Sequence, residues 1–344
     1  MWVIATSILW TSLGVLLFQS RFMPSYLPRL LGRSLYWAGV PLQILALARR
    51  SDFSEAVWLP PMITVLVLFS GLGLANLSLH FLKQLTYQAG IHSYHTERSQ
   101  ISDALVENSR WGFRLPFAAD LFTKIWTRQR SGQGSFVLAS MLGNTGFVGL
   151  AIAPAFVSTP YLGWIVLYGV THNLFGSYGL GVFLASYFGR QKQQINWWIQ
   201  LRDVLSVPAL WAFAIGWSTR YIELPAFMEL GLQASLWFVI PGAFLLIGMQ
   251  LSQLRGLKSL QLALVPATLK MLVLPGLAGL GLTLFGVSGD ARFALVLMSG
   301  MPTAFANLIL AEEYNLDRQL AAGSIVLSTV VLPLMIPFWL ALFG

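Results

Sequence analysis

The amino-acid sequence predicts an all-α membrane protein with ten transmembrane helices. Hydrophobic residues make up 56% of the 344 residues, charged residues make up 10%, and the apolar residues gather into segments long enough to cross a bilayer. A soluble domain carries roughly 25% charged residues, and a spanning helix needs about 20 mostly apolar residues. The surface of this chain therefore suits lipid better than water.

Ten segments of the chain are apolar enough to be spans. The first is interpreted as a retained helix, because no basic region precedes it and no small-residue cleavage site follows it. Tryptophans near several predicted ends, such as Trp58 and Trp217, are typical of interfacial anchors. The expected spans are residues 2–19, 34–48, 57–82, 135–157, 161–188, 203–219, 230–251, 260–285, 291–311 and 319–343.

The basic residues are distributed unevenly between the two sides of the membrane. With the N-terminus outside, the outward loops hold four of the 21 lysines and arginines (Arg49, Arg50, Arg220 and Arg292), Lys270 lies within a span, and all the others face inward. Because cytoplasmic loops carry the excess of positive charge, we expect both termini on the non-cytoplasmic side of the plasma membrane. The net charge of +8 is thus explained without nucleic acid.

One sizeable hydrophilic loop is expected, at 83–134. Its second half, "WGFRLPFAADLFTKIWTRQR", mixes aromatic with basic residues. Such a mixture predicts an amphipathic helix on the inner membrane face, with a partner-binding segment as the alternative.

The two halves of the chain resemble each other. Pro41 in "GVPLQIL" corresponds to Pro241 in "VIPGAFLLIG", and "NTGF" at 144–147 corresponds to "PTAF" at 302–305. Residues 1–188 and 189–344 each hold five expected spans. Since five is odd, the second half enters from the opposite side, which predicts an inverted repeat of the kind found in secondary transporters.

The fourth and ninth spans contain residues that interrupt helices. In "LGNTGFVGLAIAPAF" these are Gly143, Gly149 and Pro154, and in "SGMPTAFANLILAEEY" it is Pro302. Transporters with inverted repeats bind substrate at such paired interruptions, near the bilayer midplane. We therefore expect two broken helices whose freed backbone groups line a cavity, although the glycines equally fit close helix packing.

Strong polar groups occur in some spans and are missing from others. The first, second, sixth and seventh spans carry only Ser, Thr and Gln, which indicates a scaffold. The third to fifth and eighth to tenth spans would form the bundle that carries substrate. The candidate substrate-binding residues are Asn144, Thr145, Gly146, His172, Asn173, Lys270, Pro302, Thr303 and Asn307.

The charges within the spans favour an anionic substrate. Lys270 is the lone basic residue placed in a span, no Asp or Glu lies deep in one, and helix N-termini carry partial positive charge. Other roles stay open: Lys270 could snorkel to an interface, and Asn144 could cap a broken helix end. His172 could relay a proton, bind a carboxylate, or bond neutrally to Asn173 or a backbone carbonyl.

Two segments of the chain resemble segments of a known family of transporters. "NTGFVGLAI" in span four and "MPTAFANLILAEEYNLDRQLAAGSIVLSTVVLPLMIPFWLALFG" at the end of the chain are similar to segments of auxin efflux carrier (AEC) family transporters. The sequence departs from that family at Gly149-Leu150-Ala151 and at Asn307, where better-known members carry a crossover proline. Pro154 and Pro302 are expected to break the helices instead.

The resemblance implies a fold similar to that of bile-acid/sodium symporters. It implies ten spans in two inverted repeats that cross at spans four and nine, with spans one, two, six and seven as scaffold. Members of the family export auxin or carry carboxylates such as malate and malonate. The implied mechanism is an elevator, in which the bundle slides past the scaffold.

The function predicted from the sequence is secondary transport of a small organic anion, a carboxylate, across a lipid membrane. The alternatives are a sodium- or proton-coupled symporter, or a non-transporting sensor or scaffold of the same fold; a homodimer is left open. No His-Glu-x-x-His, Gly-x-Ser-x-Gly or buried carboxylate pair is present, so we expect no enzyme. No cofactor, metal or nucleic-acid partner is expected.

Overall fold

The protein is mainly helical. The computed structural model describes residues 2–20, 24, 26–51, 56–100, 130–189, 198, 205, 208–252 and 257–344. Within these ranges no strand forms, and one isolated β-bridge joins Gly143 and Thr303. Five helices among the described residues are long and apolar enough to cross a membrane, which supports the predicted all-α integral membrane protein. They are Leu30–Arg50, Leu59–Gln84, Ala226–Met249, Leu260–Leu284 and Arg318–Phe343.

The helical segments follow the predicted spans in order, while the ten-span inverted arrangement itself stays a prediction. The first half contains α1 (Trp2–Gln19), α2 (Leu27–Ser34), η1 (Leu35–Gly39), α3 (Val40–Arg50), α4 (Leu59–Gln100), α6 (Arg130–Met141), η2 (Thr145–Gly149), α7 (Leu150–Ile152), η3 (Ala153–Ala155), η4 (Thr159–Tyr161), α8 (Leu162–Thr171), η5 (His172–Gly181) and α9 (Val182–Phe188). The second half contains α11 (Pro208–Ser218), α12 (Ala226–Leu251), α13 (Leu257–Thr268), η6 (Leu269–Val273), α14 (Leu274–Leu284), α15 (Gly289–Ser299), α16 (Ala306–Glu313) and α17 (Arg318–Phe343).

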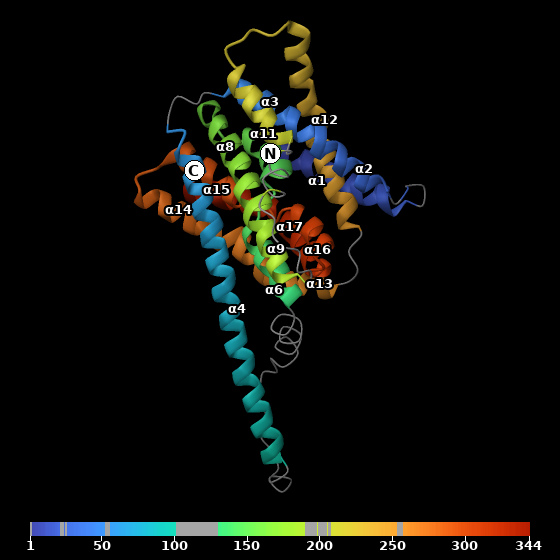
Figure 1. Ribbon diagram of the computed structural model, residues 1–344, viewed down its shortest axis with the longest axis vertical. Coiled ribbons are helices and arrows are strands. Elements are labelled where there is room, and N and C mark those ends of the chain that lie inside the picture. Colours follow the sequence, from blue (N-terminus) through green and yellow to red (C-terminus); the bar gives the residue numbers. More distant parts are fainter. Residues whose placement is uncertain are drawn as a thin grey trace.

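Helix α4 is longer than the sequence predicts. It continues through Gln100 for 42 residues, so the first part of the expected loop 83–134 is helical. At 1.5 Å per residue its length is about 63 Å, roughly twice the hydrocarbon thickness of a bilayer. Figure 1 shows α4 projecting beyond the other described helices. Hydropathy marks where the apolar stretch ends, but residues 83–100 hold no proline that would end the helix. Except for Arg130, the expected amphipathic segment lies outside the described residues.

The described helices pack in two groups. Helices α1, α2, α3, α11 and α12 contact one another and lie together at the upper right of Figure 1; we call them the α3 group. The other helices gather around α6, α15 and α17, and we call them the crossing bundle. The two groups meet where Phe244 and Ile247 of α12 join the apolar core that contains Met298 of α15.

Specific contacts hold the α3 group together. Arg49, at the end of α3, donates hydrogen bonds to the carbonyls of Thr219 and Ile222 and lies 3.8 Å from the Glu229 carboxylate. These contacts tie α3 to the turn between α11 and α12. Helices α1 and α12 approach so closely that a methyl group added at Gly248 would collide with the Thr11 carbonyl. Such close approach is typical of small residues at membrane helix interfaces.

Two prolines explain two wide helical turns. In η1 the Val40 N–H donates to the Leu35 carbonyl, and in η6 the Leu274 N–H donates to the Leu269 carbonyl, five residues back in each case. Pro41 and Pro275 follow directly after these donors. A proline has no N–H and its ring clashes with the carbonyl four residues earlier, and a wider turn relieves that clash. The second of these turns carries Lys270.

Candidate functional site at the crossing of two interrupted helices

Two helices of the crossing bundle are interrupted. Helix α6 ends at Met141 and the chain becomes helical again at Thr145, while α15 ends at Ser299 and α16 begins at Ala306. Residues 142–144 and 301–304 between them are not helical. The interruptions fall within the two stretches that the sequence singles out. Each leaves helix-terminal N–H and C=O groups that need new partners.

The two interrupted stretches pair with each other. The Asn144 N–H donates to the Pro302 carbonyl at 2.6 Å, and the Ala304 N–H donates to the Leu142 carbonyl at 2.9 Å. Between these bonds Gly143 lies opposite Thr303 in an antiparallel bridge. The helices therefore cross through a short piece of β-like pairing, which satisfies backbone groups that would otherwise be buried without partners.

Side chains from the second stretch complete the end of α6. The Thr303 hydroxyl donates to the Ala139 carbonyl at 3.1 Å, and the Asn307 side-chain amide donates to the Leu138 carbonyl at 3.1 Å. In a continuous helix the Gly143 N–H would donate to the Ala139 carbonyl, but here it donates to the His172 side chain. Thr303 and Asn307 thus have a clear structural role, and the Asn307 Oδ1 atom is left buried without a partner.

Lys270 completes the end of α15. Its ammonium nitrogen donates to the Ser299 carbonyl at 2.6 Å, and the side chain is 1% exposed. A Cβ added at Gly143 would lie 2.9 Å from this nitrogen, so the lysine lies directly against the crossing point. A cation at a helix C-terminus is favoured by the helix dipole. Lys270 does not snorkel to an interface here.

His172 supports the crossing from η5. Its Nε2 atom accepts a hydrogen bond from the Gly143 N–H at 3.1 Å. Only a neutral ring can accept at Nε2, and its proton is then on Nδ1. That Nδ1 atom is buried without a partner, and so is the hydroxyl of Tyr168, whose ring stacks on His172 with centroids 6.3 Å apart. A backbone N–H is therefore a partner of His172 that was not considered from the sequence.

Hydrogen-bond donors meet at the beginning of η2. The Asn144 Oδ1 atom caps this end by accepting from the Phe147 N–H at 3.2 Å. Among the described residues, neither the side-chain nitrogen of Asn144 nor the N–H of Gly146 has a partner. A Cβ at Gly146 would lie 3.3 Å from the Asn173 side-chain nitrogen and 3.9 Å from Val40. Since Val40 belongs to α3, these donors lie at the boundary between the two helix groups.

Two residues that the sequence analysis passed over also have unpaired polar atoms. Gln43 in α3 is fully buried, and neither its Oε1 nor its Nε2 has a partner. It follows Val40 by three residues and so lies on the same helix face. The Trp339 ring nitrogen is also buried without a partner, 3.4 Å from a Cβ added at Gly300. Gln43 could have been identified from the sequence, because its side-chain amide lies within the apolar run "VPLQILAL".

One further asparagine of the spans and the remaining predicted residues take ordinary structural positions. Asn76 is exposed and donates to the Leu72 carbonyl of its own helix at 2.9 Å. Gly149 ends η2, and a Cβ there would lie 3.1 Å from the Met298 sulfur, so it permits close packing. Pro154 lies in η3, well after the interruption. Pro302 contributes its carbonyl to the crossing, and the hydroxyl of Thr145 is buried without a partner.

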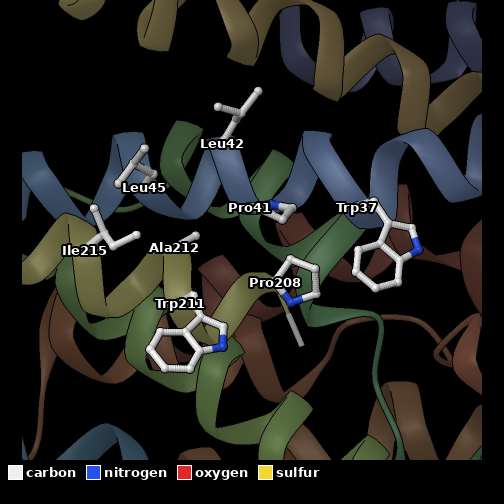
Figure 2. Close-up of a pocket in the computed structure, with 8 residues that line it drawn as sticks. All are labelled: Trp37, Pro41, Leu42, Leu45, Pro208, Trp211, Ala212 and Ile215. Atoms are coloured by element: carbon white, nitrogen blue, oxygen red, sulfur yellow. The ribbon is translucent and has the colours of Figure 1, made fainter. Parts of the chain in front are cut away.

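A separate groove lies on the outer face of α3. It has a volume of about 480 Å³ and runs between α3 and α11, as Figure 2 shows. Trp37 and Trp211 border it and are 59% and 56% exposed. The groove offers no charged side chain, so it suits lipid and not an anion. Its lining residues are Trp37, Pro41, Leu42, Leu45, Pro208, Trp211, Ala212 and Ile215.

Comparison with known proteins gives two relatives, and no family model matches the chain. The chain is 27% identical over 214 residues to a protein of Methanocaldococcus jannaschii, which covers 60% of this chain and 67% of the relative. It is 26% identical over 226 residues to a protein of Methanothermobacter thermautotrophicus, which covers 62% of this chain and 71% of the relative. Both relatives are described as uncharacterized transporters. The similarity supports a membrane transporter role, while the likeness to auxin efflux carriers stays a prediction.

Proposed function

We propose that the chain is a secondary transporter that moves a small organic anion, a carboxylate, across the membrane. The observation that carries this proposal is the group of unpaired donors at the beginning of η2. The Gly146 N–H and the side-chain amides of Asn144 and Asn173 gather there, beside Val40 of the α3 group. A carboxylate accepts several hydrogen bonds and matches such a set of donors.

The charges around the crossing also favour an anion. The N-terminus of η2 carries partial positive charge, and the Lys270 ammonium group lies close to it, against Gly143. Segments η2, η5 and η6 and residues 301–304 contain no Asp or Glu. We therefore assign substrate contact first to Asn144, Gly146 and Asn173. Thr145, His172 and Asn307 are nearby groups with an unpaired atom, and Pro302 and Thr303 hold the crossing in place.

The transport mechanism that we propose is an elevator. The α3 group serves as scaffold and the crossing bundle as the moving unit, with ten spans in two inverted repeats, 1–188 and 189–344. The donor site lies where the two groups meet, so sliding of the bundle would open it to one side of the membrane and then to the other. We place both termini on the non-cytoplasmic side, in accord with the distribution of basic residues.

Reconstitution into liposomes tests this function. The purified chain is supplied with labelled mono- and dicarboxylates, and uptake is measured with and without a proton gradient. Asn144→Ala and Asn173→Ala each remove a donor whose hydrogen bond to a charged group contributes about 1.5–3 kcal/mol. That loss corresponds to a roughly 10- to 100-fold weaker apparent affinity.

Asn76→Ala is the matched control, because this asparagine bonds only within its own helix. It should transport as the wild type does. Carboxylate uptake that is indifferent to both Asn144→Ala and Asn173→Ala would refute the donor site. Absence of flux for every carboxylate in the panel would refute the proposed substrate class.

A further inference from the structure

The groove between α3 and α11 is closed at one end. The two helices run in the same direction, because Arg49, near the end of α3, donates to the carbonyl of Thr219, just after the end of α11. They touch near these ends, since a Cβ added at Gly216 would lie only 2.9 Å from the Ala48 Cβ. The groove therefore opens toward the beginnings of both helices and narrows toward their ends.

The groove is about as long as one leaflet of a bilayer is deep. Its lining runs from Trp37 to Leu45 on one side and from Pro208 to Ile215 on the other, as Figure 2 shows. At 1.5 Å per residue these stretches rise about 10–12 Å. Half of a hydrocarbon core that is about 30 Å thick is about 15 Å. A groove of this length suits a single acyl chain that lies along the bilayer normal.

The walls of the groove match a lipid in polarity as well. Its lining side chains carry no charge, and tryptophans stand near its open end. The Trp211 ring N–H donates to the Leu205 carbonyl at 2.6 Å, so its polar edge is satisfied while the ring borders the groove. Tryptophan is enriched where the hydrocarbon core meets the head groups. The open end of the groove therefore has the character of a membrane interface.

An exposed arginine lies just beyond the open end. Arg33 lies in the last turn of α2 and precedes Trp37 by four residues, so both lie on the same helix face. Among the described residues, no carboxylate or carbonyl oxygen pairs with Arg33. Residues 1–51 and 208–218 contain no Asp or Glu. The apolar groove is thus headed by a positive charge that no acidic residue of these segments neutralises.

We propose that the groove holds one acyl chain of an anionic phospholipid, whose phosphate group is bound by Arg33. A guanidinium group binds phosphate oxygens through two parallel hydrogen bonds, and its long stem allows the charge to reach the head-group layer. Basic sites between membrane helices on the cytoplasmic side bind anionic head groups in this way. The distribution of basic residues predicts that this end of α3 faces the cytoplasm.

A second copy of the chain is a poorer occupant than a lipid. A helix with its side chains is about 10 Å wide, and the groove narrows to the contact between Gly216 and Ala48. The proposed lipid would anchor the α3 group in the inner leaflet. Pro41 lines the groove, while the neighbouring Val40 lies beside the donor site at Gly146. Lipid binding itself does not depend on the proposed transport function.

Lipid-dependent unfolding of the purified full chain in a neutral detergent tests the proposal. Dioleoylphosphatidylglycerol and dioleoylphosphatidylcholine are titrated separately, since they share their acyl chains and differ in the head group. Both should raise the melting temperature of the wild type. The apparent affinity for phosphatidylglycerol should be about fivefold higher, as expected for one arginine near an anionic lipid. Glycerol phosphate, which lacks an acyl chain, should leave the melting temperature unchanged.

Two variants and two matched controls locate the site. Arg33→Gln should lower the affinity for phosphatidylglycerol to that for phosphatidylcholine, and Ala212→Phe should abolish the response to both lipids by filling the groove. Arg50→Gln changes an exposed arginine at the other end of α3, and Ala214→Phe changes an exposed alanine of α11 outside the groove lining. Both controls should respond as the wild type does. If Ala212→Phe does not fold, Arg33→Gln decides the matter.

Several results would overturn the proposal. These are equal affinity of the wild type for the two lipids, an unchanged preference in Arg33→Gln, a lost preference in Arg50→Gln, a wild-type response of folded Ala212→Phe, or stabilisation by glycerol phosphate. A wild-type dimer that Ala212→Phe converts to a monomer would overturn it too, by assigning the groove to a second copy. Since no substrate is present, the absence of carboxylate flux would refute the proposed function and leave the lipid site to these measurements.

Discussion

The substitution Gly143→Ala probes the crossing at its tightest point. A Cβ at this position would lie 2.9 Å from the Lys270 ammonium nitrogen, 3.0 Å from its Cε and 3.4 Å from the Met301 carbonyl oxygen. The lysine would have to move away, and its 2.6 Å bond to Ser299 would lengthen or break. Overpacking of a dense interior costs about 1–3 kcal/mol, and a hydrogen bond to a charged group contributes about 1.5–3 kcal/mol.

We therefore expect Gly143→Ala to destabilise the protein by about 2.5–6 kcal/mol, combining these two effects. Thermal unfolding in detergent measures the stability, and liposome uptake measures the flux, which should fall sharply. Gly73→Ala is the matched control, because a Cβ there meets no atom within 4 Å, and alanine in an exposed helix is neutral or stabilising. Equal melting temperatures and equal flux for Gly143→Ala and Gly73→Ala would show that the crossing can accommodate an added methyl group and that the packing argument is wrong.

Two further substitutions test single contacts of the site. Thr303→Val removes the hydroxyl that donates to Ala139 and leaves a buried carbonyl unpaired, so the melting temperature should drop by an amount equivalent to about 1–3 kcal/mol; an unchanged melting temperature would mean that another donor replaces it. Gln43→Leu removes a buried amide that has no partner, so stability should stay level or rise. Transport should weaken because the amide lies on the same face of α3 as Val40, which adjoins the donor site at Gly146; a fully active variant would exclude Gln43 from the site.

Sequence reasoning located the two interruptions because glycine, asparagine and proline are poor residues for the interior of a helix. It could not assign partners to the polar residues there. Substrate contact by Lys270, Thr303 and Asn307 stays a prediction. The structure adds that Lys270 donates to the end of α15, and that Thr303 and Asn307 complete the end of α6. A broken helix needs donors for its carbonyls, but the side chain that supplies one lies 29 residues away in the chain for Lys270, 164 for Thr303 and 169 for Asn307.

Helix α4 shows a different limit of prediction from the sequence, which concerns where a helix ends. Hydropathy predicted where the third span leaves the membrane, near Leu82, but the helix continues to Gln100. A helix ends where its backbone hydrogen bonds are interrupted, and a change from apolar to polar side chains does not interrupt them. The prediction therefore held for the apolar part of the helix and failed for its polar continuation.

The sequence by itself determined that this chain is a helical membrane protein, because a composition with 10% charged residues cannot cover a water-soluble surface. It also determined where two helices would break, since that depends on local backbone preference. Only the tertiary structure decided that the two breaks pair through Gly143 and Thr303, and that Asn144, Gly146 and Asn173 keep free donors while Lys270 does not lie open to solvent. Whether a buried polar atom is satisfied depends on its neighbours in space, and local sequence does not contain that information.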